Sequence, residues 1–120
     1  AALEHDIPVV LGNDVGCPWI TQYDFWRELF YIHKYVGVSN AFALYTATAR
    51  AAEMAGIGAE TGTIEPGKSA DLIVTVENPL EDLRALRKVE MVVTQGRKID
   101  HPQVKINPVV AAELDQFLVE

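Results

Sequence analysis

The apolar positions of the chain change their spacing along its length. Residues 7–11, Ile-Pro-Val-Val-Leu, form a short continuous apolar run, which is typical of a strand buried on both faces in a parallel sheet. Asp14 follows at the carboxyl end of this predicted strand. Residues 25–36 then carry apolar side chains at helical spacing, and residues 41–55 form a second, alanine-rich helical segment. After Thr61 the spacing becomes that of short strands separated by turns.

The first helix is predicted to run from Thr21, its cap, to about Val36, with Gly37 as its stop. Asp24 lies in the first turn, where the helix macrodipole favours a carboxylate. The apolar stripe of this helix includes His33, for which packing is a better interpretation than metal ligation. The polar face opposite the stripe comprises Arg27, Tyr31 and Lys34.

The second helix is capped by Ser39 or Asn40 and ends at Gly56 or Gly58. Because small residues cover nearly all its faces, we expect this helix to be closely packed and deeply buried. Short strands follow at residues 63–64, 71–76, 89–94 and 97–99, with a helical turn at 81–86. Gln95-Gly96 is expected to make a two-residue hairpin turn, and Asn107 to cap a last helix at 108–117 with Pro108 first.

Composition and charge narrow the classes of partner. The 120 residues are 49% hydrophobic and carry a net charge of -7, which would repel nucleic acid and anionic lipid. The alanine-rich segment is interrupted by polar residues, so no stretch reads as a membrane span. The single cysteine, Cys17, cannot form an internal disulfide, and a reducing cytoplasm is the expected location. The first six residues look like the end of a helix entered midway, as in the later part of a longer protein.

Five segments in order resemble the amidohydrolase superfamily. They are residues 11–14 (Leu-Gly-Asn-Asp), 43–52, 62–74, 78–83 and 92–97. The stretch Gly-Thr-Ile-Glu-Pro-Gly-Lys-Ser-Ala-Asp-Leu within 62–74 is the most specific. The Asp-Val-Gly that begins at residue 14 is most similar to the dipeptidase and imidazolonepropionase branch.

The resemblance implies an α/β fold. Residues 1–60 would supply the last strand and helices of a (β/α)8 barrel that holds one or two divalent metals. Residues 61–100 would supply the C-terminal strands of a small β-sandwich, and residues 101–120 a C-terminal extension with a helix. Asp14, at the end of a buried parallel strand, lies where barrel enzymes place catalytic groups.

By the same resemblance, Asp14 is both a metal contact and the catalytic residue that accepts a proton from the attacking water. Asn13 stands where the family has a Thr. The loop after the strand places Cys17 and Trp19 as candidate substrate contacts, although both residues could instead pack against the following helix. The implied reaction is hydrolysis of a C–N bond in an amide, cyclic amide or dipeptide.

The remaining metal ligands of such a site, a His-x-His pair among them, are not found in this sequence. His5, His33 and His101 lack ligand spacing. We therefore expect the chain to contribute to a zinc or similar site whose other ligands lie outside it. Alone, it is expected to be inactive.

Two other groups of polar residues have structural interpretations. Glu65, Lys68 and Asp71 flank a Pro-Gly turn, and Asp71 is expected to accept backbone hydrogen bonds at the entry to a strand. Thr48 is expected to bond within its helix or to support the barrel floor.

Two alternatives remain open at the level of sequence. One is a heterocycle deaminase of the same superfamily, which shares this tail. The other is a non-catalytic assembly module that uses the terminal helix. An incomplete barrel would expose strand edges and apolar faces. The remaining barrel segment or identical subunits are accordingly the expected macromolecular partners.

Overall fold

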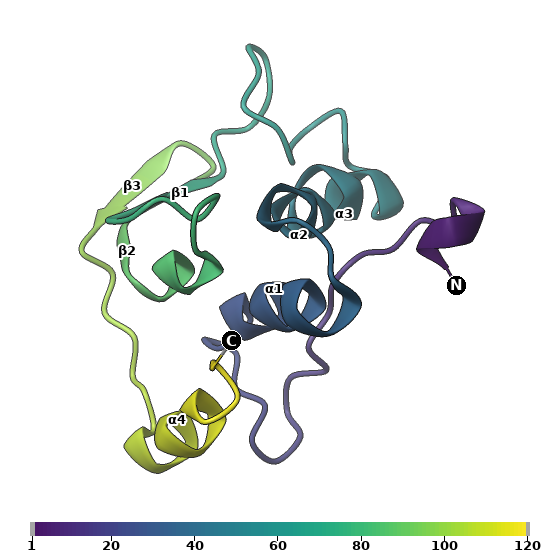
Figure 1. Cartoon of the computed structure of the whole chain (residues 1–120). Coiled ribbons are helices and arrows are strands. Elements are labelled where there is room, and N and C mark those ends of the chain that lie inside the picture. The colour runs from purple at the N-terminus through teal and green to yellow at the C-terminus, as the bar shows by residue number, and fades with distance from the viewer. Residues whose placement is uncertain (1, 120) are drawn as a thin grey trace.

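Helix α1 (Trp26–Tyr31) lies at the centre of the molecule, with the alanine-rich helical segment on one side and a small sheet and the C-terminal helix on the other (Figure 1). The computed structural model describes residues 2–119. The core is formed by six buried side chains from segments far apart in the sequence. These are Leu29, Phe30, Ile32, Ala43, Leu83 and Leu118.

Helix α1 continues directly into η2 (Ile32–Val36), a π-helical segment. Gly37 ends it in the left-handed region at φ 78°, and its N–H donates to the carbonyl of His33 at 3.0 Å, as predicted for a stop at this residue. Two predictions about the polar and apolar faces of this helix are wrong. Arg27 is only 2% exposed, because an ion pair neutralises it. His33 is exposed, and its Nδ1 lies 2.7 Å from the carbonyl oxygen of Val38 beyond the helix end.

The alanine-rich segment forms two helices, α2 (Asn40–Ala47) and α3 (Ala49–Met54), rather than one. Ser39 caps α2 by accepting a hydrogen bond from the Phe42 N–H at 3.1 Å. The break falls at Thr48, whose backbone is far from helical at φ −122°, ψ −95°, and whose hydroxyl donates to the Leu44 carbonyl at 2.7 Å. The prediction of deep burial holds for one side only, since Ala43, Thr46 and Ala52 are buried while Met54 is 59% exposed.

Three antiparallel strands form the sheet, in the order β1 (Leu72–Thr75), β2 (Val89–Thr94), β3 (Arg97–Asp100). The turn between β2 and β3 is Gln95-Gly96, with φ of 49° and 75°, as in the hairpin turns that match strand twist. A register shift between Val74 and Thr75 interrupts the pairing of β1 with β2. The α/β class is thus confirmed at the level of mixed helices and an antiparallel sheet.

Two predicted strands are absent from the part of the chain that the structure describes. Residues 7–11 run irregularly, although Val9 and Leu11 pack against the core. A strand needs a neighbour for its backbone hydrogen bonds, and within residues 2–119 no strand lies beside this segment. Thr63 ends a bend, Ile64 follows it without regular structure, and Ile64 is 88% exposed.

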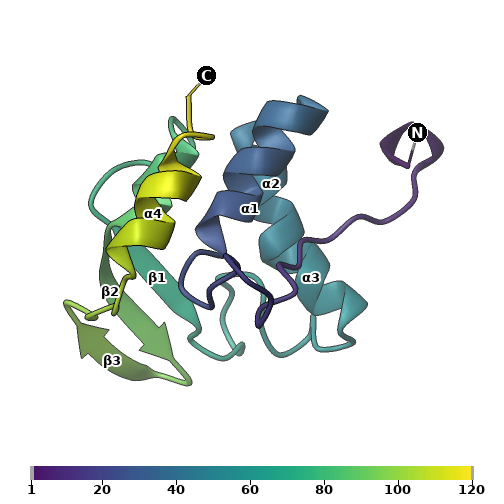
Figure 2. The ribbon, with the colours of Figure 1, turned by 90° about the horizontal axis from the view of Figure 1, so that it is seen from below.

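The second half of the chain adds two helical elements. The 3-10 helix η3 (Leu83–Arg87) inserts Leu83 and Ala85 into the interior. Helix α4 (Pro108–Asp115), capped by Asn107 as predicted, lies beside α1 (Figure 2). A short turn, η1 (Leu3–His5), lies at the other end of the chain, away from the sheet. None of the helices described between residues 2 and 119 has the length and apolar character needed to cross a bilayer.

Candidate active-site loop

The loop from Asp14 to Ile20 holds every predicted site residue in a compact turn. Asp14, Gly16 and Trp19 have φ of 47°, 113° and 71°, and such values are rare for a bulky residue like Trp19. The Ile20 N–H donates to the Cys17 carbonyl at 3.1 Å, and the Gly16 N–H donates to the Ile20 carbonyl at 3.5 Å. Backbone strain of this kind gathers at functional sites, and here it lies on both sides of Cys17.

The structure brings Asp14 and Cys17 together. The Cys17 thiol lies 3.8 Å from Oδ2 of Asp14, and both side chains are exposed. Asp14 is the carboxylate of this loop.

The residues of this chain do not complete a metal site. Among residues 2–119, no three His, Cys, Asp or Glu side chains come close enough together to hold an ion. A catalytic zinc site requires three protein ligands, and Asp14 would provide one oxygen. A divalent metal therefore does not fit the donors present in this part of the chain.

Trp19 is 49% exposed and borders a small cavity of about 130 Å³ beside the loop. Asn13, Thr21 and Tyr31 contribute to the walls, and Leu114 of α4 closes one side. Burial raises the pKa of both Glu28 and Tyr31 in this cavity, and for Tyr31 it outweighs the opposing effect of the nearby Arg27 guanidinium. Cys17 is not among the lining residues.

A network of charged side chains lies directly behind the loop. Arg27 donates from Nη2 to Asp115 at 2.7 Å and from Nε to Asp24 at 3.1 Å. Arg87 donates to the other Asp115 oxygen at 2.9 Å. The Thr21 hydroxyl donates to the second oxygen of Asp24.

This network shifts the pKa values of Arg27 and Asp115. Burial alone would lower the pKa of Arg27, but its hydrogen bonds with Asp115 and Asp24 outweigh burial and raise it. Burial would likewise raise the pKa of Asp115, but the hydrogen bonds from Arg27 and Arg87 outweigh it and lower that pKa. The sequence alone does not show this network, because 88 residues separate Arg27 from Asp115. The spacing of Asp24 and Arg27 was the only local signal.

Outside the loop, the polar groups have structural roles. Asp71 accepts the Gln95 N–H at 2.7 Å and the Thr61 hydroxyl at 3.1 Å, which confirms the predicted role at the strand entry. The hydrogen bond from the Gln95 backbone, followed by those from side chains, lowers the pKa of Asp71. Lys68 binds the Thr63 hydroxyl at 2.6 Å across the Pro-Gly turn.

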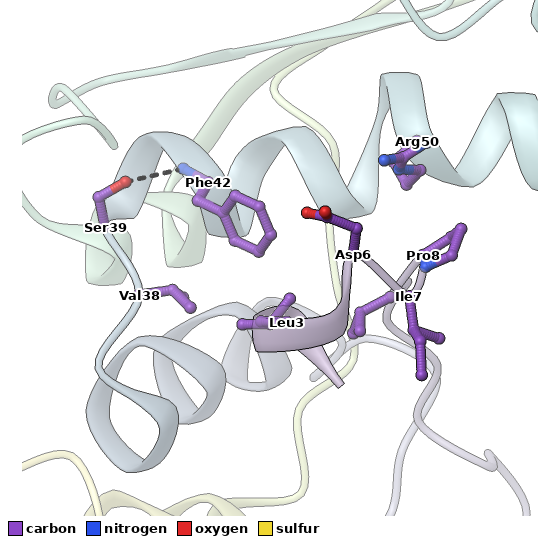
Figure 3. Close-up of a pocket in the computed structure, with 9 residues that line it drawn as sticks. Leu3, Asp6, Ile7, Pro8, Val38, Ser39, Phe42 and Arg50 are labelled. Carbon is purple, nitrogen blue, oxygen red and sulfur yellow. Dashed lines mark hydrogen bonds between the residues drawn. The ribbon is translucent and has the colours of Figure 1, made fainter. Parts of the chain in front are cut away.

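A larger hollow, of about 430 Å³, lies between the N-terminal segment and helices α2 and α3 (Figure 3). Phe42 forms an apolar wall facing Leu3, and Asp6 and Arg50 are its charged residues. The Ser39 hydroxyl at its edge is occupied in capping α2. Asp14, Cys17 and Trp19 do not line this hollow, so it is not the predicted substrate pocket.

Comparisons with known proteins find one matching family model and several similar solved structures. Residues 1–99 match the family model described as the amidohydrolase family. A candidate prolidase from Bifidobacterium longum is 43% identical, with a TM-score of 0.92, over 96% of this chain and 28% of its own. No curated protein matches the sequence.

Two further solved structures are similar. A Xaa-Pro dipeptidase with bound methionine in its active site is 31% identical, with a TM-score of 0.74, over 82% of this chain and 24% of its own. A molinate hydrolase is 27% identical, with a TM-score of 0.74, over 90% of this chain and 27% of its own. The chain thus spans about a quarter of the length of these relatives.

The fold of this chain and the order of its sequence motifs are those of a class of proteins related to hydrolases. The chain belongs to the amidohydrolase family.

Proposed function

We propose that the complete protein is a metal-dependent hydrolase of C–N bonds and that a dipeptide of the Xaa-Pro type is its substrate class. The observation that carries this proposal is the similarity to a candidate prolidase over nearly the whole chain, at 43% identity. The Xaa-Pro dipeptidase supports the same class at 31% identity. Within the dipeptidase and imidazolonepropionase branch that the sequence resembles, these relatives favour a dipeptidase.

The proposal assigns the fold of the complete protein as well. Residues 1–60 would close a (β/α)8 barrel, residues 61–100 would add strands to a β-sandwich, and residues 101–120 would form an extension. The irregular path of residues 7–11 is compatible with this assignment, because its backbone would pair only when neighbouring barrel strands are present. The single cysteine supports a cytoplasmic location.

Asp14 is proposed as the proton-transfer residue. It lies exposed at the start of a strained loop, after the segment that would be the last barrel strand. A divalent metal, zinc or a similar ion, would lower the pKa of a water when held by Asp14 together with ligands outside this chain. The Asp14 carboxylate would accept the water's proton and later deliver it to the leaving nitrogen. Cys17 and Trp19 are proposed to contact the substrate.

The test compares Asp14→Asn with the wild-type complete protein on Xaa-Pro dipeptides. Because general acid–base catalysis contributes about 10²–10⁴-fold, kcat is expected to fall at least about a hundredfold. Asp100→Asn is the matched control, since Asp100 is exposed and pairs with Lys98 at 2.9 Å on the far edge of the sheet. Loss of the same activity in both variants, or in neither, would contradict the role of Asp14.

A heterocycle deaminase is the second candidate. The Escherichia coli guanine deaminase shares the fold, with a TM-score of 0.61 at 20% identity. Ammonia release from guanine, without dipeptide cleavage, would favour this candidate. A complete protein without either activity and without bound metal would favour an assembly module instead.

A further inference from the structure

Helix α4 is joined to α1 by an ion pair at a buried site. Asp115, in the last turn of α4, accepts from Arg27 at 2.7 Å, and Arg27 is 2% exposed. A buried charge is strongly unfavourable unless it is paired and hydrogen-bonded. The position of Asp115 relative to α1 is consequently tightly defined.

The same guanidinium also fixes the start of α1. Its Nε donates to Asp24 at 3.1 Å, while Nη2 faces Asp115. Because the guanidinium is planar and its donors are fixed in direction, Asp24 and Asp115 are held at a set separation. The second oxygen of Asp24 accepts from the Thr21 hydroxyl, and the Asp24 N–H donates to the Thr21 carbonyl at 3.1 Å.

Thr21 directly follows the candidate active-site loop. Within this loop, the Gly16 N–H donates to the Ile20 carbonyl and the Ile20 N–H donates to the Cys17 carbonyl, so that the loop closes on itself. A second, independent observation concerns Leu114, the neighbour of Asp115, which borders the same small cavity as Asn13 and Trp19. Helix α4 is therefore linked to the end of the loop through Arg27 and Asp24, and it shares a cavity with residues at both ends of the loop.

We propose that α4 positions the candidate active-site loop, with Asp115 as a positioning residue that acts through Arg27, Asp24 and Thr21. Helix α4 lies beyond residues 1–99, the part that the family model matches. Its role is therefore an addition to what the family assignment covers. The catalytic consequence of this inference rests on the proposed function. Its structural part rests on the hydrogen bonds alone.

The experiment uses the complete protein and the variants Asp115→Asn and Asp115→Glu. Misplacement of a catalytic group by about 1 Å costs up to about a hundredfold in rate. We therefore expect Asp115→Asn to lower kcat about tenfold, with a smaller change in KM. Asp115→Glu keeps the negative charge and is expected to recover most of the lost kcat. If α4 stabilised the fold without positioning the loop, this recovery would not be required.

Hydrogen exchange measured by mass spectrometry supplies a readout that does not depend on activity. In Asp115→Asn, the peptide covering residues 14–21 should exchange at least several-fold faster, while the peptide covering the β2–β3 hairpin should be unchanged. Thr21→Val removes the hydroxyl that donates to Asp24, at the opposite end of the series of contacts from Asp115. It should give the same pattern of hydrogen exchange while α4 stays docked on α1. This variant serves the test if Asp115→Asn does not fold.

Two controls separate positioning from general loss of stability. Asp100→Asn removes an exposed carboxylate of the same kind, and Ser39→Ala removes the cap of α2, far from the loop. Neither should change kcat or loop exchange. Unchanged loop exchange in both Asp115→Asn and Thr21→Val would overturn the inference. Faster loop exchange in a complete protein that cleaves no dipeptide would support the positioning and would overturn the proposed function instead.

Discussion

Gly62 lies where the chain passes closest to helix α3. Its φ is +98°, and an added Cβ would lie 2.5 Å from the Cβ of Ala52 and 3.3 Å from the Cα of Ala49. Contacts this short require the backbone to move, because the neighbouring atoms are not the ends of flexible side chains. Gly62 begins the segment by which the sequence most resembles its family, so part of that motif has a packing explanation.

Substitution of Gly62 tests this explanation. Gly62→Ala is expected to lower the free energy of unfolding by about 2–4 kcal/mol, through overpacking and an unfavourable φ. Gly67→Ala is the matched control, since Gly67 has a similar φ of +92° but open space around it. It should cost only about 1 kcal/mol. Urea denaturation measures both, and equal losses would show that φ, rather than the contact with Ala52, restricts residue 62.

At the residue scale, roles set by neighbours in sequence were predictable and those set by distant partners were not. Asp71 was correctly placed at a strand entry, because carboxylates there commonly accept backbone N–H groups. Arg27 was assigned to the polar face, because the sequence does not show that Asp115 lies opposite it. For Asp14, Cys17 and Trp19 the structure gives positions in one loop, and their chemical roles stay predictions.

The boundaries of helices and strands were also predictable where neighbouring residues set them, and not where distant partners do. Ser39, Asn107 and Gly37 end or begin helices as predicted, because capping depends on a few adjacent residues. The break at Thr48 was not predicted, since alanine favours helix on both sides of it. The strand expected at 7–11 failed for another reason. Its apolar pattern is that of a parallel strand, and such a strand depends on partners distant in sequence.

Docking of α4 should depend on pH. The folded pKa of Asp115 lies below its ordinary value, because hydrogen bonds from Arg27 and Arg87 outweigh burial. The unfolded chain therefore binds a proton at higher pH than the folded chain does, so acid favours unfolding. This contribution to stability is complete above about pH 5 and is lost as pH falls through the folded pKa of Asp115.

We expect the contribution to be about 1 kcal/mol, since about a third of the Asp115 side chain is exposed and solvent screens the pair. Urea midpoints of wild type and Asp115→Asn, measured at neutral pH and at about pH 3, provide the test. Their difference should shrink in acid. Asp71 and Asp82, whose pKa values are also lowered, keep both proteins acid-sensitive. A difference that is constant with pH would contradict a charged role for Asp115.

Over the part of the molecule that the structure describes, many large apolar side chains lie on the surface. Several are more than half exposed, among them Ile7, Tyr35, Val36, Ile64 and Val76. Strands β1 and β3 both form open edges of the described sheet, and such edges pair readily with other chains. The chain spans about a quarter of the length of its solved relatives, and we propose that these surfaces contact protein outside it.

The 120-residue chain by itself is therefore expected to associate in solution. Sedimentation velocity across a concentration series should show species heavier than the monomer, and Ile64→Lys should shift the distribution toward the monomer. Ile64 is suited to this test because its side chain is 88% exposed, so its replacement removes apolar surface without opening the core. Gln103→Lys adds the same charge at an exposed polar position and should have little effect. A wild-type chain that stays monomeric throughout would show that the exposed apolar side chains are too dispersed to drive contact between copies.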